Sequence, residues 1–414
     1  MTEKQLPKAV VAFAGARDHY QLPLALSEAN LLEALVTETY FPANRPWFNQ
    51  SLGKVLPSSL VAARFCAGLP SRRVRVPARA FAASAAMQIS KVKWDAHKDA
   101  SLSERSRQIA ARTGAAIFSY SYYGYEAFRD GPDRAPFRFL FQVHPHPQSI
   151  REILSEELER TPQGAFSLCA ESEMSWPDKH FSRLAEEPKL ANGWVVASSY
   201  TAQTLADNGI PRDQIHVVPY GVDTSAFSKR INASAPDKPF RVVFIGSLIQ
   251  RKGLSYLFEA VRLLNSCNIQ ILLCGRGTID QDLINHYQDL NIEVCIGLPR
   301  AELVRRVHEC DVFVLPSLVE GFAHVIVEAM ACGLPIITTD HTCGPDVLSE
   351  GEDGFIVPIR DARAIAQKLS WGMDNRAELA RMGEAAAARA ACFSWEKFRA
   401  GVREAYAKML DGAN

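Results

Sequence analysis

CDVFVLPSLVEGFAHVIVEAMACGLPIITT, residues 310–339, is the stretch that decides the fold expected of this chain of 414 residues. Its apolar run at 312–315, closed by a proline, predicts a buried strand of a parallel sheet. Residues 323–332 predict a helix that a glycine ends, and the β-branched run at 336–339 predicts the next strand. We therefore expect one strand–helix–strand unit of an α/β sheet.

Two acids lie where such a unit binds ligands, because ligands sit at the carboxyl ends of parallel strands, where helix N-termini point. Glu320, in the first loop, could accept hydrogen bonds from sugar hydroxyls, and Glu328, about two helical turns further, could bind another pair. The backbone N–H groups at 322–324 would suit a phosphate. On spacing alone, a surface acid at Glu320 and a solvated acid at Glu328 remain the alternative.

The segment DVFVLPSLVEGFAHVIVEAMACGLPII, residues 311–337, resembles the E-x7-E signature of the retaining GT-B glycosyltransferases of family 4, glycosyl transferases group 1. The resemblance implies two Rossmann-like domains whose parallel sheets face a central cleft. It also implies that a hexosyl unit passes from a UDP- or GDP-sugar to an acceptor hydroxyl with retention of anomeric configuration. In this family the leaving phosphate helps to take the acceptor's proton, so we expect no side-chain nucleophile. We expect no metal or other cofactor.

Arg251 and Lys252 precede Gly253 at the start of a predicted helix, after a predicted strand at 241–246. Two cations are mildly unfavourable at the positive end of a helix dipole, and a bound diphosphate would resolve that conflict. The element resembles the R-K-G element of the family, which implies that both cations bind the donor diphosphate and neutralise the leaving nucleotide. Ordinary surface cations are the alternative.

The C-terminal half alternates predicted strands and helices, as a second Rossmann-like domain would. The resemblance implies an N-terminal acceptor domain (1–222), a hinge (223–239), a nucleotide-sugar domain (240–392) and a helix (393–414) that crosses back to the N-terminal domain. The D-x-D at Asp280 has the form of a metal site, but we interpret it as a helix cap.

The expected site combines these motifs with the N-terminal half. The resemblance implies catalytic roles for Glu320, His144, Arg251 and Lys252. It implies donor-binding roles for Gly15, Arg251, Lys252, Gly275, Leu298, Glu320, Gly321, Phe322, Ala323 and Glu328.

The N-terminal half opens with a predicted strand at 9–14 and a predicted helix at 20–36. Gly15 ends the strand and would let the backbone approach a ligand, although a plain tight turn explains it equally well. Residues 17–19 follow directly and could face the cleft.

His144 and His146 follow a predicted strand at 137–143, between prolines that stop strand pairing. The end of that strand lies where the cleft is expected. His144 resembles the histidine that the family places under the donor sugar, whereas His146 could equally be structural. The pair could suggest a metal, but no third ligand is visible nearby.

Residues 60–98 hold eight Lys or Arg against one acid, with apolar residues between them. Such a segment can contact an anionic membrane surface, and a solvated basic face is the alternative. We do not expect nucleic acid as a partner, because only part of one domain is basic and the formal net charge is zero.

Charged residues make up 22% of the chain and hydrophobic residues 47%, as in a globular protein with a large core. The nine scattered cysteines and the lack of an apolar leader predict a cytoplasmic protein, at most peripheral to the membrane. The acceptor expected is a lipid-linked or polysaccharide-precursor saccharide. A catalytically silent GT-B scaffold is the main alternative, and the lack of a G-x-G-x-x-G makes a Rossmann oxidoreductase a poor one.

Overall fold

The computed structural model describes residues 6–41, 64–90, 95–129, 137–224, 227 and 238–412. Seven parallel strands form the N-terminal sheet in the order β3-β2-β1-β4-β5-β6-β7. They are β1 (Ala9–Ala12), β2 (Leu32–Val36), β3 (Val74–Arg75), β4 (Ala116–Tyr120), β5 (Arg138–Gln142), β6 (Gly193–Val196) and β7 (Ile215–Val217).

Helices connect these strands, as parallel pairing requires. They are α1 (Gln21–Glu28), α4 (Ala78–Ser90), α5 (Asp95–Thr113), α6 (Tyr125–Arg129), α7 (Pro147–Arg160), α8 (Ala165–Ala170), α9 (Ser172–Ser175), α10 (Asp178–Leu190) and α11 (Ser199–Asp207), with the 3-10 helix η1 (Arg17–Tyr20) after β1.

A second parallel sheet, in the order β10-β9-β8-β11-β12-β13, forms the C-terminal domain. Strand β11, at its centre, is buried at every residue, which explains its unbroken apolar sequence. Its strands are β8 (Phe240–Leu248), β9 (Ile269–Ile279), β10 (Ile292–Ile296), β11 (Val312–Leu315), β12 (Ile336–Thr339) and β13 (Gly354–Val357).

The helices of this half are α12 (Leu254–Leu264), α13 (Gln281–Asn285), α14 (Arg300–Val307), α15 (His324–Ala331), α16 (Gly344–Val347), α17 (Ala362–Asp374), α18 (Arg376–Ala390) and α19 (Trp395–Gly412), with η6 (Gln250–Lys252) after β8. In both sheets the first strand is central and the order reverses beside it. This confirms the expected pair of Rossmann-like sheets, in which ligand sites lie at the carboxyl ends of the strands.

The helix predicted at 20–36 is wrong. The structure has α1, then a left-handed residue at Asn30 (φ 58°), then β2, which pairs with β1 in the register Ala9 to Leu32. The apolar residues of β2 fit a helical stripe and a buried parallel strand equally well, and sheet pairing decided between them.

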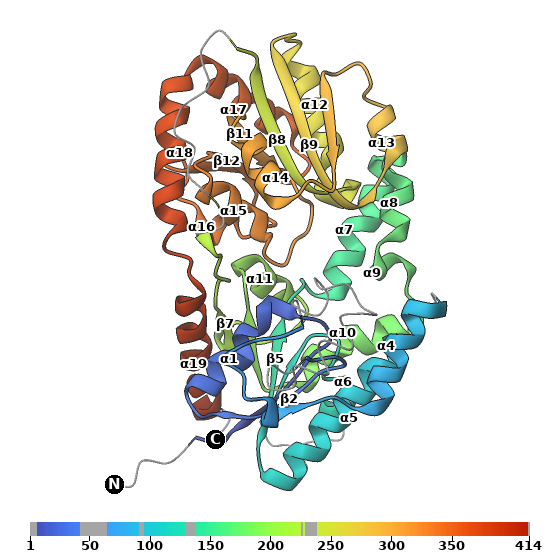
Figure 1. Ribbon diagram of the computed structural model, residues 1–414. Helices are drawn as coiled ribbons and strands as arrows, with labels where there is room; N and C mark the ends of the chain where they lie inside the picture. Colours follow the sequence, from blue (N-terminus) through green and yellow to red (C-terminus); the bar gives the residue numbers. More distant parts are fainter. Residues whose placement is uncertain are drawn as a thin grey trace.

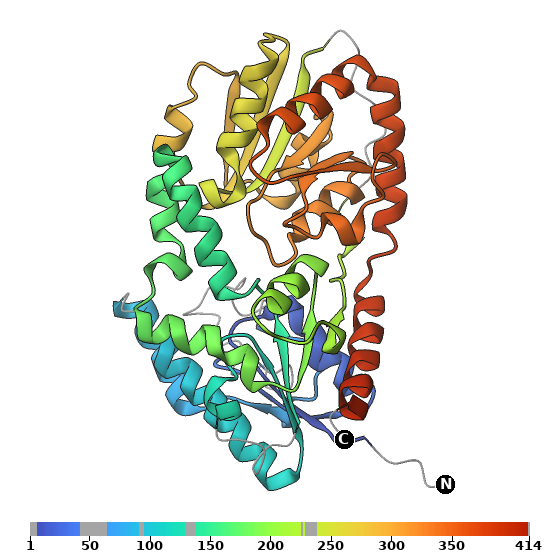
Figure 2. The ribbon, with the colours of Figure 1, turned by 180° about the vertical axis from the view of Figure 1, so that it is seen from behind.

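The chain passes between the domains twice, and the two passages lie side by side. The N–H of Val222 donates to the carbonyl of Phe393 (2.9 Å), and a side chain at Gly221 would collide with Trp395. After the second passage α19 runs down the N-terminal domain, as Figures 1 and 2 show, and the Tyr406 hydroxyl donates to the Pro7 carbonyl (2.8 Å). Most of the segment expected as the hinge, 223–239, lies outside the described residues.

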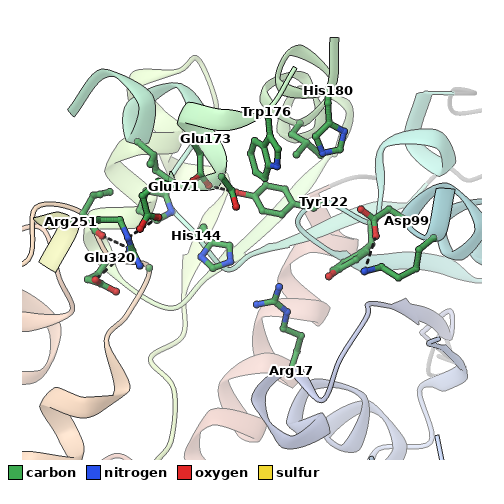
Figure 3. Close-up of a pocket in the computed structure, with 18 residues that line it drawn as sticks. Arg17, Asp99, Tyr122, His144, Glu171, Glu173, Trp176, His180, Arg251 and Glu320 are labelled. Carbon is green, nitrogen blue, oxygen red and sulfur yellow. Dashed lines mark hydrogen bonds and ion pairs between the residues drawn. The ribbon is translucent and has the colours of Figure 1, made fainter. Parts of the chain in front are cut away.

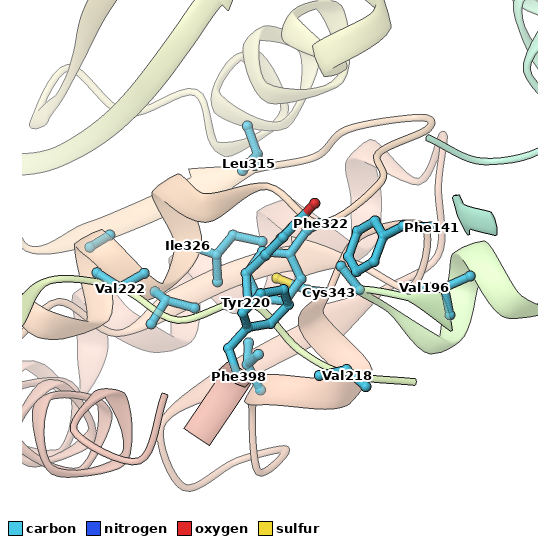
Figure 4. Close-up of a cluster of buried hydrophobic side chains, with 14 of the residues drawn as sticks. Phe141, Val196, Val218, Tyr220, Val222, Leu315, Phe322, Ile326, Cys343 and Phe398 are labelled. Carbon is cyan, nitrogen blue, oxygen red and sulfur yellow. The ribbon is translucent and has the colours of Figure 1, made fainter. Parts of the chain in front are cut away.

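The ring of Tyr220 joins the two domains in an apolar cluster (Figure 4). It is buried, packs near Phe141 of β5 and Phe398 of α19, and stacks on His324 with 4.7 Å between ring centroids. Tyr220 therefore contributes to the packing between the domains.

Candidate active site

Two cavities lie at the boundary between the domains, and they share no lining residue. The cleft cavity, about 350 Å³, is lined by Arg17, Tyr122, His144 and the segment 171–176 of the N-terminal domain and by Arg251 and Glu320 of the C-terminal domain. The C-domain cavity, about 580 Å³, is lined by Lys252, Gly275, Leu298, Ala323 and Glu328, among others. Figure 3 shows the labelled side chains around the cleft cavity.

Glu320, Arg251 and Lys252 form a charge cluster that links the two cavities, because Arg251 and Glu320 line the cleft cavity and Lys252 lines the C-domain cavity. Strands β8 and β11 are neighbours in the sheet, so η6 and the loop after β11 emerge at the same edge. Lys252 Nζ forms an ion pair with Glu320 Oε1, while Arg251 Nη1 lies 3.4 Å from that oxygen and donates to the Val319 carbonyl (3.0 Å). The spacing of the two motifs in sequence gave no sign of this contact.

The two cations keep Glu320 ionised although it is buried. Burial alone would raise the pKa of Glu320, but Lys252 and Arg251 outweigh it and hold that pKa below its ordinary value. Burial lowers the pKa of Lys252, and Glu320 opposes that shift. Glu171 also lies 3.1 Å from Arg251 Nε, so two cations face two carboxylates, and an anionic ligand beside Lys252 would compete with Glu320 for that lysine.

Two glycines make this geometry possible. Gly253 has φ 73°, and a Cβ there would lie 1.9 Å from the carbonyl oxygen of Pro316. A Cβ at Gly321 would lie 2.0 Å from the carbonyl oxygen of Val143, at the end of β5. Each allows a close backbone approach that a side chain would prevent.

His144 faces the cleft cavity, as its position at the end of β5 predicted (Figure 3). Its ring stacks on Tyr122 with 5.7 Å between centroids. Burial lowers the pKa of His144 to about 3, with further lowering by Arg17 and Arg251, so its imidazole is neutral at pH 7. His146 is instead buried, caps α7 through the Gln148 N–H (3.2 Å) and lies 3.1 Å from the Ala185 carbonyl, which identifies it as structural.

The C-domain cavity gathers several residues expected to bind the donor. Glu328, in α15, lies 3.9 Å from Arg300, and its pKa is raised by burial, against the opposing charge of Arg300. Gly275, within β9, and Leu298, after β10, line the same cavity. Ala323 begins α15 with a left-handed backbone (φ 67°).

Two expected donor-binding residues line neither cavity. Gly15 donates its N–H to both carboxylate oxygens of Glu38 (2.9 and 3.0 Å), so this amide is already satisfied. Phe322 is buried and packs edge-on against Tyr220. Gly321 lines the cleft cavity, and its carbonyl accepts from the Ser198 hydroxyl (2.6 Å).

The segment after β1 has an unusual backbone. Asp18, His19 and Tyr20 have φ values of 41°, 50° and 63°, and each such left-handed conformation costs on the order of 1 kcal/mol or more for a side-chain-bearing residue. His19 lines the C-domain cavity and Arg17 the cleft cavity, whereas Asp18 receives the Tyr120 hydroxyl (2.5 Å). This backbone therefore places Arg17 and His19 at the two cavities and the Asp18 carboxylate against Tyr120.

The segment 171–180 contributes cavity residues that sequence reasoning missed. Glu171 lies 3.1 Å from Arg251 Nε, and Glu173 accepts from the Tyr122 hydroxyl (3.1 Å). The ring of Trp176 stands edge-on to Tyr122, at 5.4 Å between centroids. The juxtaposition of acids and an aromatic ring is typical of saccharide sites, but in sequence these residues resemble an ordinary helical surface.

An arm made of α7, α8 and α9 carries this segment and reaches the C-terminal domain (Figure 1). The buried Glu157 accepts from Gln250 Nε2 (2.7 Å), Tyr256 Oη (3.0 Å) and Arg360 Nε (2.9 Å). Asp280 also belongs to this contact, because it accepts from the Ser167 N–H (3.2 Å) while capping α13 through Leu283 (3.1 Å). This supports the cap interpretation of the D-x-D.

The basic segment 60–98 lies partly outside the described residues. Arg64 pairs with Glu38 (3.1 Å) and Arg73 with Glu33 (3.4 Å), so these two arginines stabilise the fold. Arg72, Arg75 and Arg79 are exposed. Of the helices the structure describes, none combines the length and apolar character needed to span a membrane.

Comparison with known proteins gives consistent findings. Residues 226–389 match the family described as glycosyl transferases group 1. The amylovoran biosynthesis glycosyltransferase AmsK of Erwinia amylovora is 29% identical over 203 residues, 46% of this chain and 49% of that protein. The chain thus spans about half the length of the curated relatives it matches.

Two solved structures align with nearly the whole chain. The sucrose-phosphate synthase of Thermosynechococcus elongatus has a TM-score of 0.63 at 17% identity, covering 98% of this chain and 100% of that one. HepE of Anabaena, in complex with UDP, has a TM-score of 0.60 at 13% identity, covering 97% and 100%. At these identities the likeness shows the fold, and it confirms the expected GT-B architecture.

Proposed function

We propose that this chain, whose residues 226–389 carry the glycosyl transferases group 1 domain, is a retaining glycosyltransferase that uses a UDP- or GDP-sugar. The observation that carries the proposal is the partly buried charge cluster of Glu320, Lys252 and Arg251, which links the linings of the two cavities. The C-domain cavity would hold the nucleotide and the cleft cavity the acceptor. The charge cluster between the two cavities would then lie beside the bond that is transferred.

The diphosphate would lie beside Lys252 and the N-terminus of α15, and Glu328 would hold the ribose. A diphosphate would draw Lys252 and Arg251 toward itself, which frees Glu320 to accept hydrogen bonds from the sugar hydroxyls. As the bond between the anomeric carbon and the phosphate oxygen breaks, the two cations stabilise the charge that builds on the leaving group. HepE, which shares the fold, is seen in complex with UDP and with UDP-glucose.

The acceptor hydroxyl would approach from the cleft cavity. Its oxygen bonds to the anomeric carbon on the face that the phosphate leaves, and its proton passes to the departing phosphate oxygen. His144 is neutral at pH 7, so it can donate or accept a hydrogen bond there without a charge. The saccharide is a lipid-linked or polysaccharide precursor, a proposal supported by the similarity to AmsK, an amylovoran biosynthesis glycosyltransferase.

Nucleotide binding tests the proposal. The melting temperature is measured with UDP, GDP, ADP and their sugars for wild type, Lys252→Ala and the control Lys408→Ala, an exposed lysine on α19. We expect one base to stabilise the wild type and the control but not Lys252→Ala, since a ligand at 100 times its Kd adds about 2.7 kcal/mol. A stabilising base would also identify the donor class.

Turnover of that donor then tests the catalytic roles. Glu320→Ala and Lys252→Ala should each lower turnover by at least about tenfold with the fold intact. Near-normal turnover in either variant would remove the role assigned to that residue. If no nucleotide stabilises the wild type, the silent GT-B scaffold becomes the better description.

Peripheral contact with the inner face of the cytoplasmic membrane is part of the proposal. Around β3 and α4, Val76 and Phe81 are 40% and 53% exposed beside the exposed Arg72, Arg75 and Arg79. Apolar side chains flanked by arginines suit an anionic lipid surface.

Co-sedimentation with vesicles containing phosphatidylglycerol tests this contact. Phe81→Glu should weaken binding, whereas Phe166→Glu, at a 62% exposed residue of α8, should not. If both variants bind the vesicles equally, the basic face is solvated and does not contact the membrane.

A further inference from the structure

Arg17 points into the cleft cavity from the loop after β1 (Figure 3). Its side chain is partly buried and makes a hydrogen bond to Tyr123, with Tyr122 and Tyr220 as further neighbours. It is also near enough to His144 to lower that residue's pKa. The guanidinium is thus held inside the cavity and does not extend into solvent.

Arg17 differs from the other cations of the cavity in its partners. Arg251 lies 3.1 Å from Glu171, and Lys98 lies 3.9 Å from Asp99. No carboxylate of the described residues lies within ion-pair distance of Arg17, and the adjacent Asp18 directs its carboxylate to Tyr120. A partly desolvated guanidinium with only neutral partners is unfavourable, and an oxyanion would compensate it.

From this geometry we infer that the acceptor carries an anionic group, a phosphate or a carboxylate, and that Arg17 binds this group in the cleft cavity. The inference rests on the proposed transfer reaction and specifies its acceptor. Tyr122 and Trp176 supply aromatic faces beside the same space, so the sugar of the acceptor packs against rings while its charged group faces Arg17.

The position of Arg17 separates this anion from the donor diphosphate. Lys252 and Glu328 line the C-domain cavity and not the cleft cavity, whereas Arg17 lines the cleft cavity and not the C-domain cavity. Glu320 lies between them and pairs with Lys252. Removal of Arg17 should therefore affect the acceptor and leave nucleotide binding unchanged.

The test measures melting temperature with a saturating nucleoside diphosphate, UDP or GDP as the nucleotide panel indicates. Inorganic phosphate, glucose 6-phosphate, glucuronate and neutral glucose are then added. The variants are Arg17→Gln, Arg17→Lys and the control Arg381→Gln, at a 71% exposed arginine of α18. Bound nucleotide occupies the cations beside Glu320, so added anions report on the remaining site.

We expect at least one anionic probe to raise the melting temperature of wild type and Arg381→Gln above the value with nucleotide alone. The increase should vanish in Arg17→Gln and remain in part in Arg17→Lys. If the Gln variant folds poorly, the smaller increase in the Lys variant tests the same role. A response to phosphate and glucose 6-phosphate only would identify a phosphate-bearing acceptor, and a response to glucuronate only a uronic one.

Three outcomes would overturn the inference: no increase with any anion in wild type, an equal increase in Arg17→Gln, or an equal increase with glucose. Each of these can occur while the nucleotide still stabilises the chain, and then only the role of Arg17 fails. Absence of any nucleotide response in wild type would instead overturn the proposed function itself.

Discussion

Asp18 shows how the strained segment after β1 affects single residues. Its Oδ2 accepts from Tyr120, while its Oδ1 is shielded from solvent and has no hydrogen-bond partner among the described residues. Burial raises the pKa of Asp18 from 3.8 to about 7, although Tyr120 and the Leu22 N–H oppose the shift. At neutral pH this acid is therefore about half protonated.

The raised pKa has a definite consequence for stability. Between about pH 4 and 7 the folded chain holds a proton on Asp18 that the unfolded chain has lost. The free energy of unfolding therefore includes a favourable contribution from Asp18 in acid, and this contribution is lost as the pH rises through 7. Asp18→Asn removes the ionisation and keeps an acceptor for Tyr120. Relative to wild type, the variant should gain roughly 1 to 3 kcal/mol between pH 5 and pH 8. Urea unfolding at both pH values measures this, and a pH-independent difference would contradict it.

At the residue scale, the sequence predicted the site where its chemistry lies in contiguous motifs. Arg251, Lys252 and Glu320 belong to two such motifs, and β8 and β11 bring them together. Glu171 and Trp176 could not be predicted, because they face the cavity only after the arm has docked on the C-terminal domain. That docking depends on contacts between residues about a hundred positions apart, which no local pattern records.

At the element scale, the strands β11 and β12 have the boundaries predicted from sequence, since an apolar run between a proline and a turn leaves little freedom. Helix α15 begins one residue later than predicted because Ala323 takes a left-handed conformation. The error at 20–36 arose where helix and strand periodicities agree, so that only pairing with β1 decides.

Gly253 controls how η6 meets the loop after β11. Gly253→Ala would place a methyl group 1.9 Å from the Pro316 carbonyl in addition to a strained φ of 73°. We expect a loss of unfolding free energy of more than about 2 kcal/mol and weaker nucleotide binding, because Lys252 precedes it. Gly351→Ala is the control, since Gly351 has φ 79° but no atom within 4 Å of its Cβ position, and should cost about 1 kcal/mol. Equal losses would show that backbone conformation alone matters.

The buried carboxylate of Glu157 joins the arm of α7, α8 and α9 to three residues of the C-terminal domain. Glu157→Ala would leave Arg360, Gln250 and Tyr256 without their shared acceptor, and we expect a loss of about 3 kcal/mol or more. Glu156→Ala is a matched control, since Glu156 is 62% exposed and also pairs with Arg360 (2.7 Å), and should cost less than about 1 kcal/mol. Denaturant unfolding compares the two, and similar losses would mean that the arm is held by its apolar contacts.

At the scale of the whole molecule, both domains meet at the N-terminus of α11. The Gly321 carbonyl accepts from the Ser198 and Thr201 hydroxyls, and the carboxylate of Asp346 accepts from the N–H (2.9 Å) and hydroxyl of Ser199. Both contacts lie beside the loop that carries Glu320. Together with the docked arm, these contacts hold the two domains against each other and so help to determine how firmly the cleft closes.

The contact between Ser199 and Asp346 should therefore affect the competition between transfer and hydrolysis. Asp346→Ala removes a carboxylate that stabilises the start of α11, opens the cleft to water and should raise hydrolysis of the donor sugar in the absence of acceptor. Ser199→Ala should act in the same direction but more weakly, because it removes the hydroxyl bond and keeps the backbone N–H bond to Asp346. The double variant should therefore match Asp346→Ala. Urea unfolding should give a coupling free energy of about 1 to 2 kcal/mol for the pair. If the losses of unfolding free energy are additive and hydrolysis of the donor is unchanged, closure of the cleft does not depend on this contact. The contacts of Gly321 and of the arm would then be the next to test.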